Sequence, residues 1–435
     1  MHRGPLKRRL EIRIKNPEAQ TFDAGMPHRK ASNEYPPSVV TAGERRHLFI
    51  GSAMSYAYEI PADTHILKQP ECHMGSEEIF SIGGFDHMIR SSMLDFRCKY
   101  NRKEWYWKKN YCGTFSVDVM EADANNLEWV FAITHCENKN EVVRTGYMDC
   151  FFHNSIDLNT PATEETSSGT KTVGIERRYR DYQPAYFGFV TMAYAPITEE
   201  TRWGAEFFHH DMGPIIWPQS GFLAPDGKGK SPGYRNPHPH PSSLIAEDPR
   251  DGKKYIYVFA NISSSRPDKN TMVGACRSPI EERGLPGTYL NLYKGEYTEA
   301  SLPHDMSEEL DVLLTHRGGR ADALHPTLYN INRFFVARLK RSGLFLSVES
   351  YREGECLETA LRLSDDLRTW TDRFVIPNTR VDSHRRRIDP GLYYPKFLSL
   401  DGSTHYEIDE SEPFYIIGTK PHELTCRELE IEILF

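Results

Sequence analysis

Two histidines stand two residues apart in RNPHPHPSSL, just ahead of a segment rich in β-forming residues. On an extended chain the side chains of His238 and His240 point the same way, so both could serve one metal ion or one substrate. Catalytic zinc sites usually take three protein ligands, and His325 is the third candidate. A sugar hydrogen bond, a general acid, a single cation on His240 and simple packing are the alternatives. The prolines stiffen the approach to a strand and place His240 at its entrance.

One carboxylate interrupts a strand that is otherwise apolar. Asp118 stands in GTFSVDVM, where the comparable positions of other segments carry Val40, Leu244, Tyr329 and Leu398. Burying a charged group is costly unless the group is hydrogen-bonded or has a function. Asp118 is therefore a candidate catalytic residue.

These side chains can meet only if the fold brings their strands together, and a repeated pattern predicts how. A small-residue or proline lead-in, a Ser/Thr-apolar strand, a turn and an aromatic strand recur five times. The copies span residues 35–51, 113–135, 240–260, 325–350 and 394–418. Helical periodicity is scarce, and Gly, Pro, Asn and Asp separate the short runs. Each copy, with the strand after it, predicts a unit of three or four antiparallel strands.

One such unit cannot bury both of its faces, and radial stacking solves this problem while hiding sheet edges. The sequence therefore predicts an all-β, five-bladed β-propeller in which residues 1–435 form a single domain. The predicted blades are roughly residues 33–110, 111–225, 232–316, 321–378 and 388–435, the last with residues 8–15.

The two ends of the chain carry the signal for closure of this ring. RRLEIRIK near the N-terminus and RELEIEILF at the C-terminus both alternate apolar and polar residues with period two. We predict that the N-terminal strand Leu10–Ile14 closes the last blade beside Leu429–Leu434. The alternative is a pair of unrelated edge strands.

Composition narrows the class of partner. Aromatic residues make up 12% of the chain, which suits pleated sheets and also stacking on sugar faces. A net charge of −8 argues against nucleic-acid and membrane-surface partners. The eight cysteines form no C-x-x-C pair, so we expect reduced, mostly buried thiols. No signal peptide or membrane span is recognisable, which leaves a cytoplasmic protein or a secreted protein whose signal was removed.

Three short motifs carry a resemblance to a known superfamily. SDDLRTW, DPRDGKKYIYVF and YPKFLSL are similar to segments of the five-bladed β-propeller glycoside hydrolases, the arabinanase, β-xylosidase and invertase-like group. The resemblance extends along the chain at the level of blades and indicates no particular family within the group. It implies a hydrolase that requires no cofactor, with a single axial calcium or other cation as an option.

The catalytic positions of that superfamily are not matched. Its carboxylates often precede the Pro-Ser pair of a blade, where this chain has, in order, Pro36, Thr114, His240, His325 and Tyr394. None of these residues is acidic, so the superfamily's acidic trio has no counterpart at these positions.

Glycoside cleavage needs one carboxyl group that protonates the leaving oxygen and a second that acts as base or nucleophile. We predict Glu349 as the acid, with Asp322 behind it, and Glu34 or Asp23 as the base. The alternative for each is a turn carboxylate that caps backbone N–H groups. Carboxylates about 5–5.5 Å apart would imply retention and about 6.5–9.5 Å inversion.

Other side chains would contact the substrate at the mouth of the propeller. The candidates for substrate contact are His135, His238, His240, His325, Arg386, Trp105 and Tyr394. Arg386 lies in RVDSHRRRIDP and could clamp an anionic group, or belong to a solvated loop. Trp105 lies in KEWYWKKNY, which could be a sugar-stacking rim or an outer strand.

The resulting prediction is a glycoside hydrolase acting on a poly- or oligosaccharide, with an anionic one as an option. Two alternatives use the same scaffold. One is a non-catalytic carbohydrate-binding propeller, and the other is a phosphate-dependent sugar phosphorylase or transferase whose arginines hold phosphate.

Overall fold

The computed structural model describes most of the C-terminal half of the chain and separate segments of the N-terminal half. It describes residues 10–19, 22–23, 37–42, 45–50, 55–60, 65, 67, 77–80, 94–98, 103–107, 111–120, 127–139, 152–154, 163–166, 169–172, 186–198, 200, 211–217, 219, 239–263, 271–303, 317–329, 333–353, 356–377, 392–420 and 423–435. In these ranges the protein consists of β-strands and one short 3-10 helix, η2 (Ile280–Glu282). That helix is too short to cross a membrane.

Five larger sheets of four or five strands form the body of the described structure. The first contains β3 (Ser38–Ala42), β4 (Arg45–Ile50), β5 (Ser55–Ile60) and β6 (Glu77–Phe80). The second contains β9 (Tyr111–Met120), β10 (Trp129–Lys139), β14 (Tyr186–Pro196) and β15 (Asp211–Ile216). The third contains β16 (Ser242–Glu247), β17 (Lys254–Ser263), β18 (Thr271–Pro279), β19 (Leu290–Tyr293) and β20 (Glu296–Ala300).

The fourth and fifth sheets each borrow a strand from elsewhere in the sequence. The fourth contains β21 (Arg333–Leu339), β22 (Phe345–Glu353), β23 (Cys356–Ser364), β24 (Phe374–Val375) and β26 (Glu407–Ile408). The fifth contains β25 (Tyr393–Leu398), β27 (Phe414–Lys420), β28 (Glu423–Leu429) and β2 (Phe22–Asp23). Pairing is antiparallel except between β21 and β26, which run parallel.

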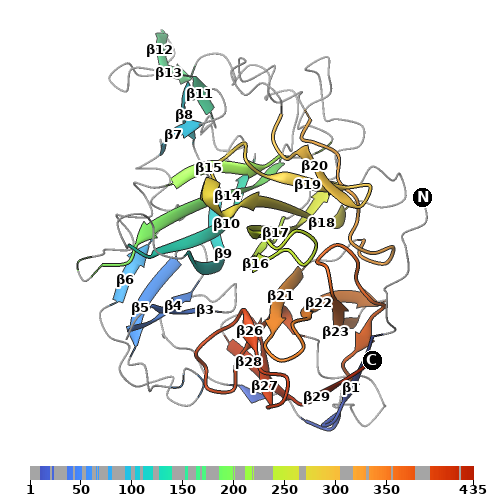
Figure 1. The fold of residues 1–435 in the computed structure, drawn as a ribbon. Helices are drawn as coiled ribbons and strands as arrows, with labels where there is room; N and C mark the ends of the chain where they lie inside the picture. Colours follow the sequence, from blue (N-terminus) through green and yellow to red (C-terminus); the bar gives the residue numbers. More distant parts are fainter. Residues whose placement is uncertain are drawn as a thin grey trace.

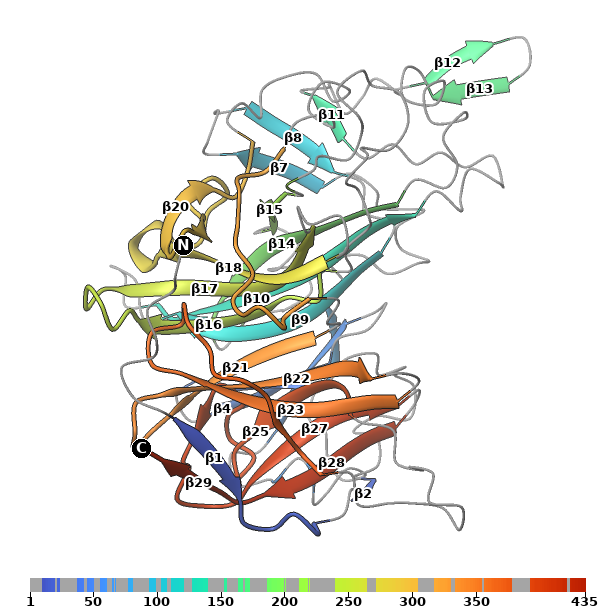
Figure 2. The same ribbon diagram turned by 90° about the vertical axis from the view of Figure 1, so that its right-hand side faces the viewer.

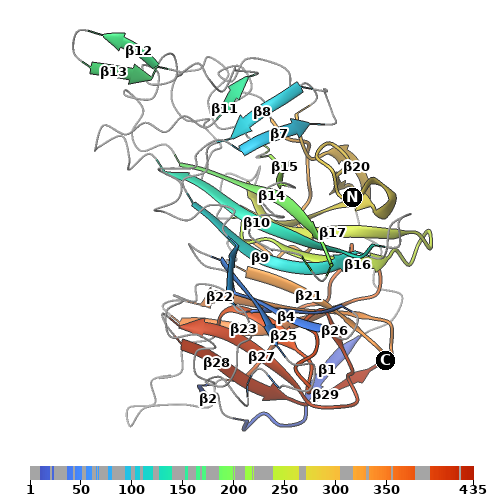
Figure 3. The same cartoon turned by 90° about the vertical axis from the view of Figure 1, so that its left-hand side faces the viewer.

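Three small sheets complete the described structure. They are β1 (Glu11–Ile14) with β29 (Ile431–Leu434); β7 (Leu94–Cys98), β8 (Lys103–Trp107) and β11 (Phe152–Asn154); and β12 (Thr163–Thr166) with β13 (Gly169–Thr172). The second and third of these sheets stand beyond β15, at one side of the molecule (Figures 2 and 3).

The larger sheets have a propeller-like arrangement. Their first strands contact one another in the order β3, β9, β16, β21 and β25. Figure 1 shows β3, β9, β16 and β21 in the middle of the molecule, with β6, β15 and β20 farther out. Side chains at the start of each first strand can therefore converge although the strands are far apart in the sequence.

Apolar side chains fill the spaces between neighbouring sheets, because alternate residues of a strand point to opposite faces. Ile133 of the second sheet packs in one cluster with Ile256 of the third. Tyr257 of the third sheet shares a cluster with Phe334 of the fourth. Phe335, on the opposite face of β21, packs in a cluster with Phe397 of the fifth sheet. The predicted all-β class is confirmed, and the third and fourth sheets each bury both faces against neighbouring sheets.

The predicted first strand of the fourth repeat is wrong. The sequence pattern placed it at residues 325–329, but the first strand of the fourth sheet is β21. The earlier segment instead runs beside β18, where Leu324 N donates to Val273 O at 3.0 Å and Val273 N donates to Leu328 O at 2.9 Å. Leu324 and Leu328 are buried in the cluster between the third and fourth sheets, and this burial holds the segment there.

The two chain ends pair with each other, as predicted, but in a sheet separate from the fifth sheet, which was the predicted one. β1 pairs with β29, with Glu11 opposite Leu434 and Ile14 opposite Ile431. These two strands form a sheet of their own, and β2 is the strand that joins the fifth sheet beside β28. Asp23 therefore lies on the outermost strand of that sheet. The predicted blade boundaries stay a prediction.

Candidate functional site

Five side chains from four sheets meet where the first strands begin. They are Phe115 on β9, His135 on β10, His240 two residues ahead of β16, Arg333 at the start of β21 and Tyr394 on β25. We call these five residues the axial cluster. Phe115, His135, His240 and Arg333 are buried, whereas Tyr394 is half-buried.

The rings of the axial cluster are in mutual contact. The His240 ring centroid lies 5.5 Å from that of His135, 5.4 Å from that of Phe115 and 5.2 Å from that of Tyr394. Phe115 also lies 5.7 Å from His135 and 5.6 Å from Tyr394. The hydroxyl of Tyr394 is 3.5 Å from Nε2 of His240. Two imidazoles, a phenol and two aromatic faces are thus gathered at one point.

Two members of the cluster have backbone conformations that are rare for their residue types. His240 has φ 36° and Tyr394 has φ 50°, both in the left-handed region, and each precedes a proline. The register of β25 against β27 shifts between Tyr393 and Lys396, which accommodates the turned backbone. Such conformations cost about 1–3 kcal/mol each and concentrate at functional sites. Both residues nevertheless adopt this conformation. The rings of His240 and Tyr394 meet edge to face, with an angle of 81° between their planes.

Arg333 lies against the tyrosine side of the cluster. Its Cζ atom is 3.3 Å from the ring centroid of Tyr394 and 5.0 Å from that of Tyr393. A guanidinium over an aromatic face gains electrostatic attraction from the ring and keeps its N–H groups in a plane beside it.

A second group of polar side chains lies buried behind Phe115. It consists of Ser38, Asp118, Ser243, Lys396 and His405, which we call the hub. Ser243 Oγ donates a hydrogen bond to Oδ2 of Asp118. Lys396 Nζ donates to Ser38 Oγ at 2.9 Å and to the Phe115 carbonyl at 2.8 Å. Nε2 of His405 lies 4.0 Å from Oδ1 of Asp118.

Burial shifts the pKa of each ionisable group in the hub. Burial raises the pKa of Asp118 to about 7, although the Ser243 hydrogen bond and the charge of Lys396 act in the opposite direction. Burial lowers the pKa of Lys396 to about 7 against the opposing charge of Asp118. The pKa of His405 falls to about 3 through burial and the charge of Lys396, so this imidazole is neutral.

Asp118 was singled out by the sequence, and the structure places it in the hub with 2% of its surface exposed. Lys396 and Arg333 were missed. Lys396 occupies the position after the proline, where other repeats carry serine or threonine, so its exceptional side chain was the available signal. Arg333 gave no signal, because the first strand of the fourth repeat was assigned to another segment.

Glu349, the predicted acid, lies on β22 and is fully buried between the third and fourth sheets. Its Oε2 accepts from Arg362 Nε at 3.0 Å, and its Oε1 accepts from Arg362 Nη2 at 3.2 Å and also from Arg373 Nε. Both oxygens are therefore already engaged by guanidinium groups within the protein. The role of Glu349 stays a prediction that this geometry does not favour.

Asp322 and His325 lie outside the axial cluster. Oδ2 of Asp322 accepts from Lys294 N at 2.6 Å in the β19–β20 turn, as a turn-capping carboxylate does. Nε2 of His325 is 3.4 Å from Oδ1 of Asp372, and its Nδ1 is 2.9 Å from Thr327 Oγ1.

The remaining predicted residues cannot be placed in the site. Glu34, His238 and Arg386 lie outside the described residues. Asp23 and Trp105 are described only as members of β2 and β8, the latter in a small sheet beyond β15. Their predicted roles stay predictions.

The axial cluster does not fit a calcium ion. Calcium takes six to eight oxygen ligands, whereas this cluster offers imidazole nitrogens, one phenol and a guanidinium that would repel a cation. Within the described ranges, no group of three or more His, Cys, Asp or Glu side chains has the geometry of a metal site.

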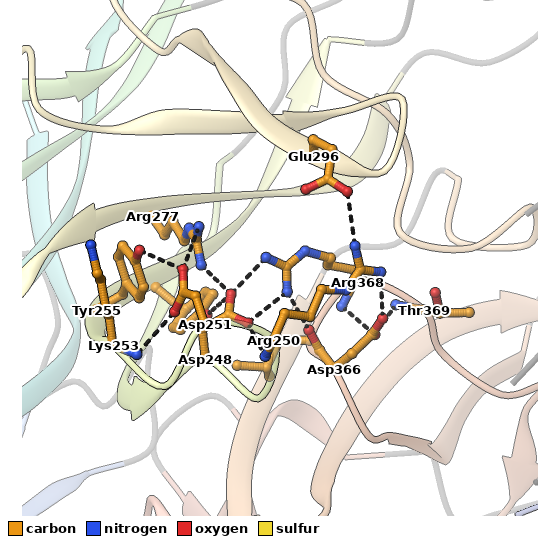
Figure 4. Close-up of polar contacts among 12 residues, drawn as sticks. Asp248, Arg250, Asp251, Lys253, Tyr255, Arg277, Glu296, Asp366, Arg368 and Thr369 are labelled. Atoms are coloured by element: carbon orange, nitrogen blue, oxygen red, sulfur yellow. Dashed lines mark hydrogen bonds and ion pairs between the residues drawn. The ribbon is translucent and has the colours of Figure 1, made fainter. Parts of the chain in front are cut away.

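Two of the three motifs that carry the superfamily resemblance, DPRDGKKYIYVF and SDDLRTW, take part in a network of charges between the third and fourth sheets (Figure 4). Asp248 of DPRDG accepts hydrogen bonds from Arg368 at 3.0 Å, from Tyr257 at 2.8 Å and from Arg277. Arg250 donates to Asp366 of SDDLRTW at 3.0 Å. These motifs therefore join neighbouring sheets, which explains why they report on architecture and not on substrate.

No protein-family model and no curated protein matches the sequence. Among solved structures, the catalytic domain of the Coprinopsis cinerea GH62 α-L-arabinofuranosidase is 8% identical, with a TM-score of 0.39 over 95% of this chain and 98% of that one. The endo-1,5-α-L-arabinanase of Thermotoga petrophila is 9% identical, with a TM-score of 0.37 over 94% and 73%. The Cellvibrio cellulosa α-L-arabinanase with arabinohexaose is 10% identical, with a TM-score of 0.34 over 93% and 91%. These values are too low to carry an argument about activity.

Proposed function

We propose that the five larger sheets are the five blades of one propeller and that the protein is a glycoside hydrolase whose substrate binds at the axial cluster. The observation that carries the proposal is the convergence of aromatic and hydrogen-bonding side chains from four sheets at one point. Aromatic rings stack on the apolar faces of sugars, while imidazole and phenol groups hydrogen-bond sugar hydroxyls.

Contacts between the last and first sheets support a closed ring. Lys396 of β25 reaches Ser38 of β3, and His405 Nδ1 lies 3.2 Å from Val39 N and 3.0 Å from Val39 O. Together with the contacts from β3 through β25, these bonds link the five first strands in a cycle. A closed ring leaves no first strand as an exposed edge.

Asp118 is the residue we propose as the acid. A general acid must hold its proton near neutral pH, and burial raises the pKa of Asp118 to about 7. Its Oδ1 atom is buried and has no hydrogen-bond partner among the described residues, so a bridging water could connect it to a substrate oxygen. In Glu349, by contrast, both oxygens are already engaged by Arg362 and Arg373.

The test is a screen of the purified full-length protein against neutral, uronate-containing and sulfated glycans, with product analysis, comparing wild type with Asp118→Asn. We expect cleavage of at least one glycan by the wild type. In the variant we expect a fall in kcat of about 10²–10⁴-fold, the usual contribution of a general acid, with little change in glycan affinity. Unchanged kcat in Asp118→Asn would exclude Asp118 as the acid.

A non-catalytic carbohydrate-binding propeller is the second candidate. The observation that favours it is that, among the described residues, Asp118 is the only carboxylate in the axial cluster and the hub, whereas hydrolysis normally uses two. Binding of a glycan without cleavage, with or without added phosphate, would support this candidate. Release of sugar only in the presence of phosphate would indicate a phosphorylase instead.

A further inference from the structure

We propose that Arg333 is an anion-recognition residue and that the sugar bound at the axial cluster carries a carboxylate. This inference rests on the proposed binding of a carbohydrate there and names the substrate class as uronate-containing glycans. It concerns a buried arginine that forms no ion pair with any described residue, whereas the buried residues Arg362 and Arg368 do.

The environment of Arg333 differs from those of the buried residues Arg362 and Arg368. Only 6% of its surface is exposed, and its Nε and Nη1 atoms have no hydrogen-bond partner among the described residues. Arg362 and Arg368 are equally buried, but each forms an ion pair, with Glu349 at 3.0 Å and with Asp248 at 2.7 Å. A buried cation without a counter-ion is unfavourable, and an incoming anion would relieve that cost.

The geometry around Arg333 suits a planar oxyanion. Stacking of the guanidinium on Tyr394 at 3.3 Å fixes its plane, and its N–H groups point outward within that plane. A carboxylate in the same plane can accept two parallel hydrogen bonds, which is the strongest pairing that arginine offers. The two tyrosines beside it, Tyr393 and Tyr394, are only half-buried.

The position of Arg333 links the anion to the sugar. Tyr394 touches both the guanidinium and the ring of His240, at 3.3 Å and 5.2 Å respectively. A sugar that stacks on the aromatic rings and hydrogen-bonds His240 would therefore carry its acid group toward Arg333. Arg333 would be a specificity residue that selects charged sugars, and it has no part in proton transfer.

The test compares ligands that differ only in charge, using the full-length protein and isothermal titration calorimetry. The probes are galacturonate and glucuronate trisaccharides, each as the free acid and as the methyl ester, and a sulfated galactose trisaccharide. We expect at least one free acid to bind about tenfold or more tightly than its ester, because only the free carboxylate can accept charge-assisted hydrogen bonds from the guanidinium. Arg333→Met should abolish this preference, and Arg333→Lys should retain part of it.

Arg338→Met is the matched control, because Arg338 lies on the same strand but is exposed. It should leave the preference for the acid unchanged. Equal binding of acid and ester, no binding of any uronate, or a preference that survives Arg333→Met would each overturn the proposal. Tighter binding of the sulfated sugar than of both uronates would overturn the assignment of a carboxylate. If Arg333→Met does not fold, the comparison of acid with ester on the wild type still decides.

The outcome is separable from that of the proposed hydrolase function. A uronate that binds through Arg333 without being cleaved would support the anion site and contradict hydrolysis. Cleavage of neutral glycans with no preference for acids would support hydrolysis and contradict the anion site.

Discussion

At the scale of single residues, the hub contains a buried carboxylate, Asp118, and a buried ammonium group, Lys396. The two are close enough for each to shift the pKa of the other. Asp118 and Lys396 both have a pKa of about 7, displaced from 3.8 and 10.5 respectively. Burial disfavours the charged form of each group, and the opposite charge of the partner partly counteracts this effect. The charge state of the propeller axis therefore changes near neutral pH.

The raised pKa of Asp118 predicts how stability depends on pH. Between about pH 4 and pH 7 the folded protein holds a proton on Asp118 that the unfolded chain has released, so the wild type loses stability as the pH rises. Asp118→Asn lacks this group. We expect the stability of the variant relative to wild type to increase from pH 4 to pH 7, measured by urea unfolding at several pH values.

Ser243→Ala serves as the matched control for this prediction. The Ser243 hydroxyl lowers the pKa of Asp118, so its removal should raise that pKa further and extend the decline of stability beyond pH 7. A stability difference between Asp118→Asn and wild type that stays constant from pH 4 to pH 7 would contradict the raised pKa.

At the scale of elements, the turn between β16 and β17 is held to the segment after β23 by buried charges. Asp248 is fully buried and pairs with Arg368 at 2.7 Å and with Arg277. Burial raises its pKa, but the hydrogen bonds from Arg368, the Arg250 backbone and Tyr257 outweigh that effect and lower it overall. This ionised carboxylate connects two sheets whose motifs are more than a hundred residues apart.

Asp248→Asn should destabilise the protein by about 3–5 kcal/mol, because it removes the charged partner of the buried Arg368 and leaves Arg277 only its longer contact with Asp251 at 3.4 Å. The measurement is the free energy of unfolding in urea. Glu296→Gln is the control, since Glu296 pairs with Arg250 at 2.9 Å on the surface and should cost no more than about 1 kcal/mol. Equal effects of the two substitutions would show that the buried pair does not hold the sheets together.

At the scale of the whole molecule, the two ends of the chain pair with each other in a separate two-stranded sheet. β1 pairs with β29, and Nδ2 of Asn16 donates to Glu428 O at 3.3 Å. Leu10 is buried in the core between the fourth and fifth sheets, and Ile12 and Ile14 pack against it. The N-terminal segment therefore contributes apolar contacts to the C-terminal half of the protein.

Removal of residues 1–16 should lower the melting temperature by several degrees. The loss of one buried leucine and two partly buried isoleucines corresponds to about 3 kcal/mol or more. The control is removal of residues 1–9, which leaves β1 and Leu10 in place and should change the melting temperature little. Identical melting temperatures for the two truncations, measured by calorimetry, would refute a stabilising role for β1.

Local patterns in the sequence were sufficient to predict the fold class and to identify one residue of the hub as a candidate. Alternation of apolar and polar residues predicted the strands and the pairing of the chain ends, because side-chain direction along a strand is a local property. A carboxylate at an apolar position identified Asp118 for the same reason. The prediction of the first strand of the fourth repeat was wrong because two segments, residues 325–329 and β21, both fit the pattern of a first strand.

By itself, then, the sequence determined that the chain forms β-sheets stacked around a common region, and it marked Asp118, His135, His240 and Tyr394 as unusual residues. Only the tertiary structure decided which of these side chains meet and what surrounds them. Glu349 and Arg333 show the difference, since one is paired with two arginines and the other has no carboxylate partner among the described residues. A charged group's behaviour depends on its neighbours in space, and packing between sheets selects those neighbours from distant parts of the chain.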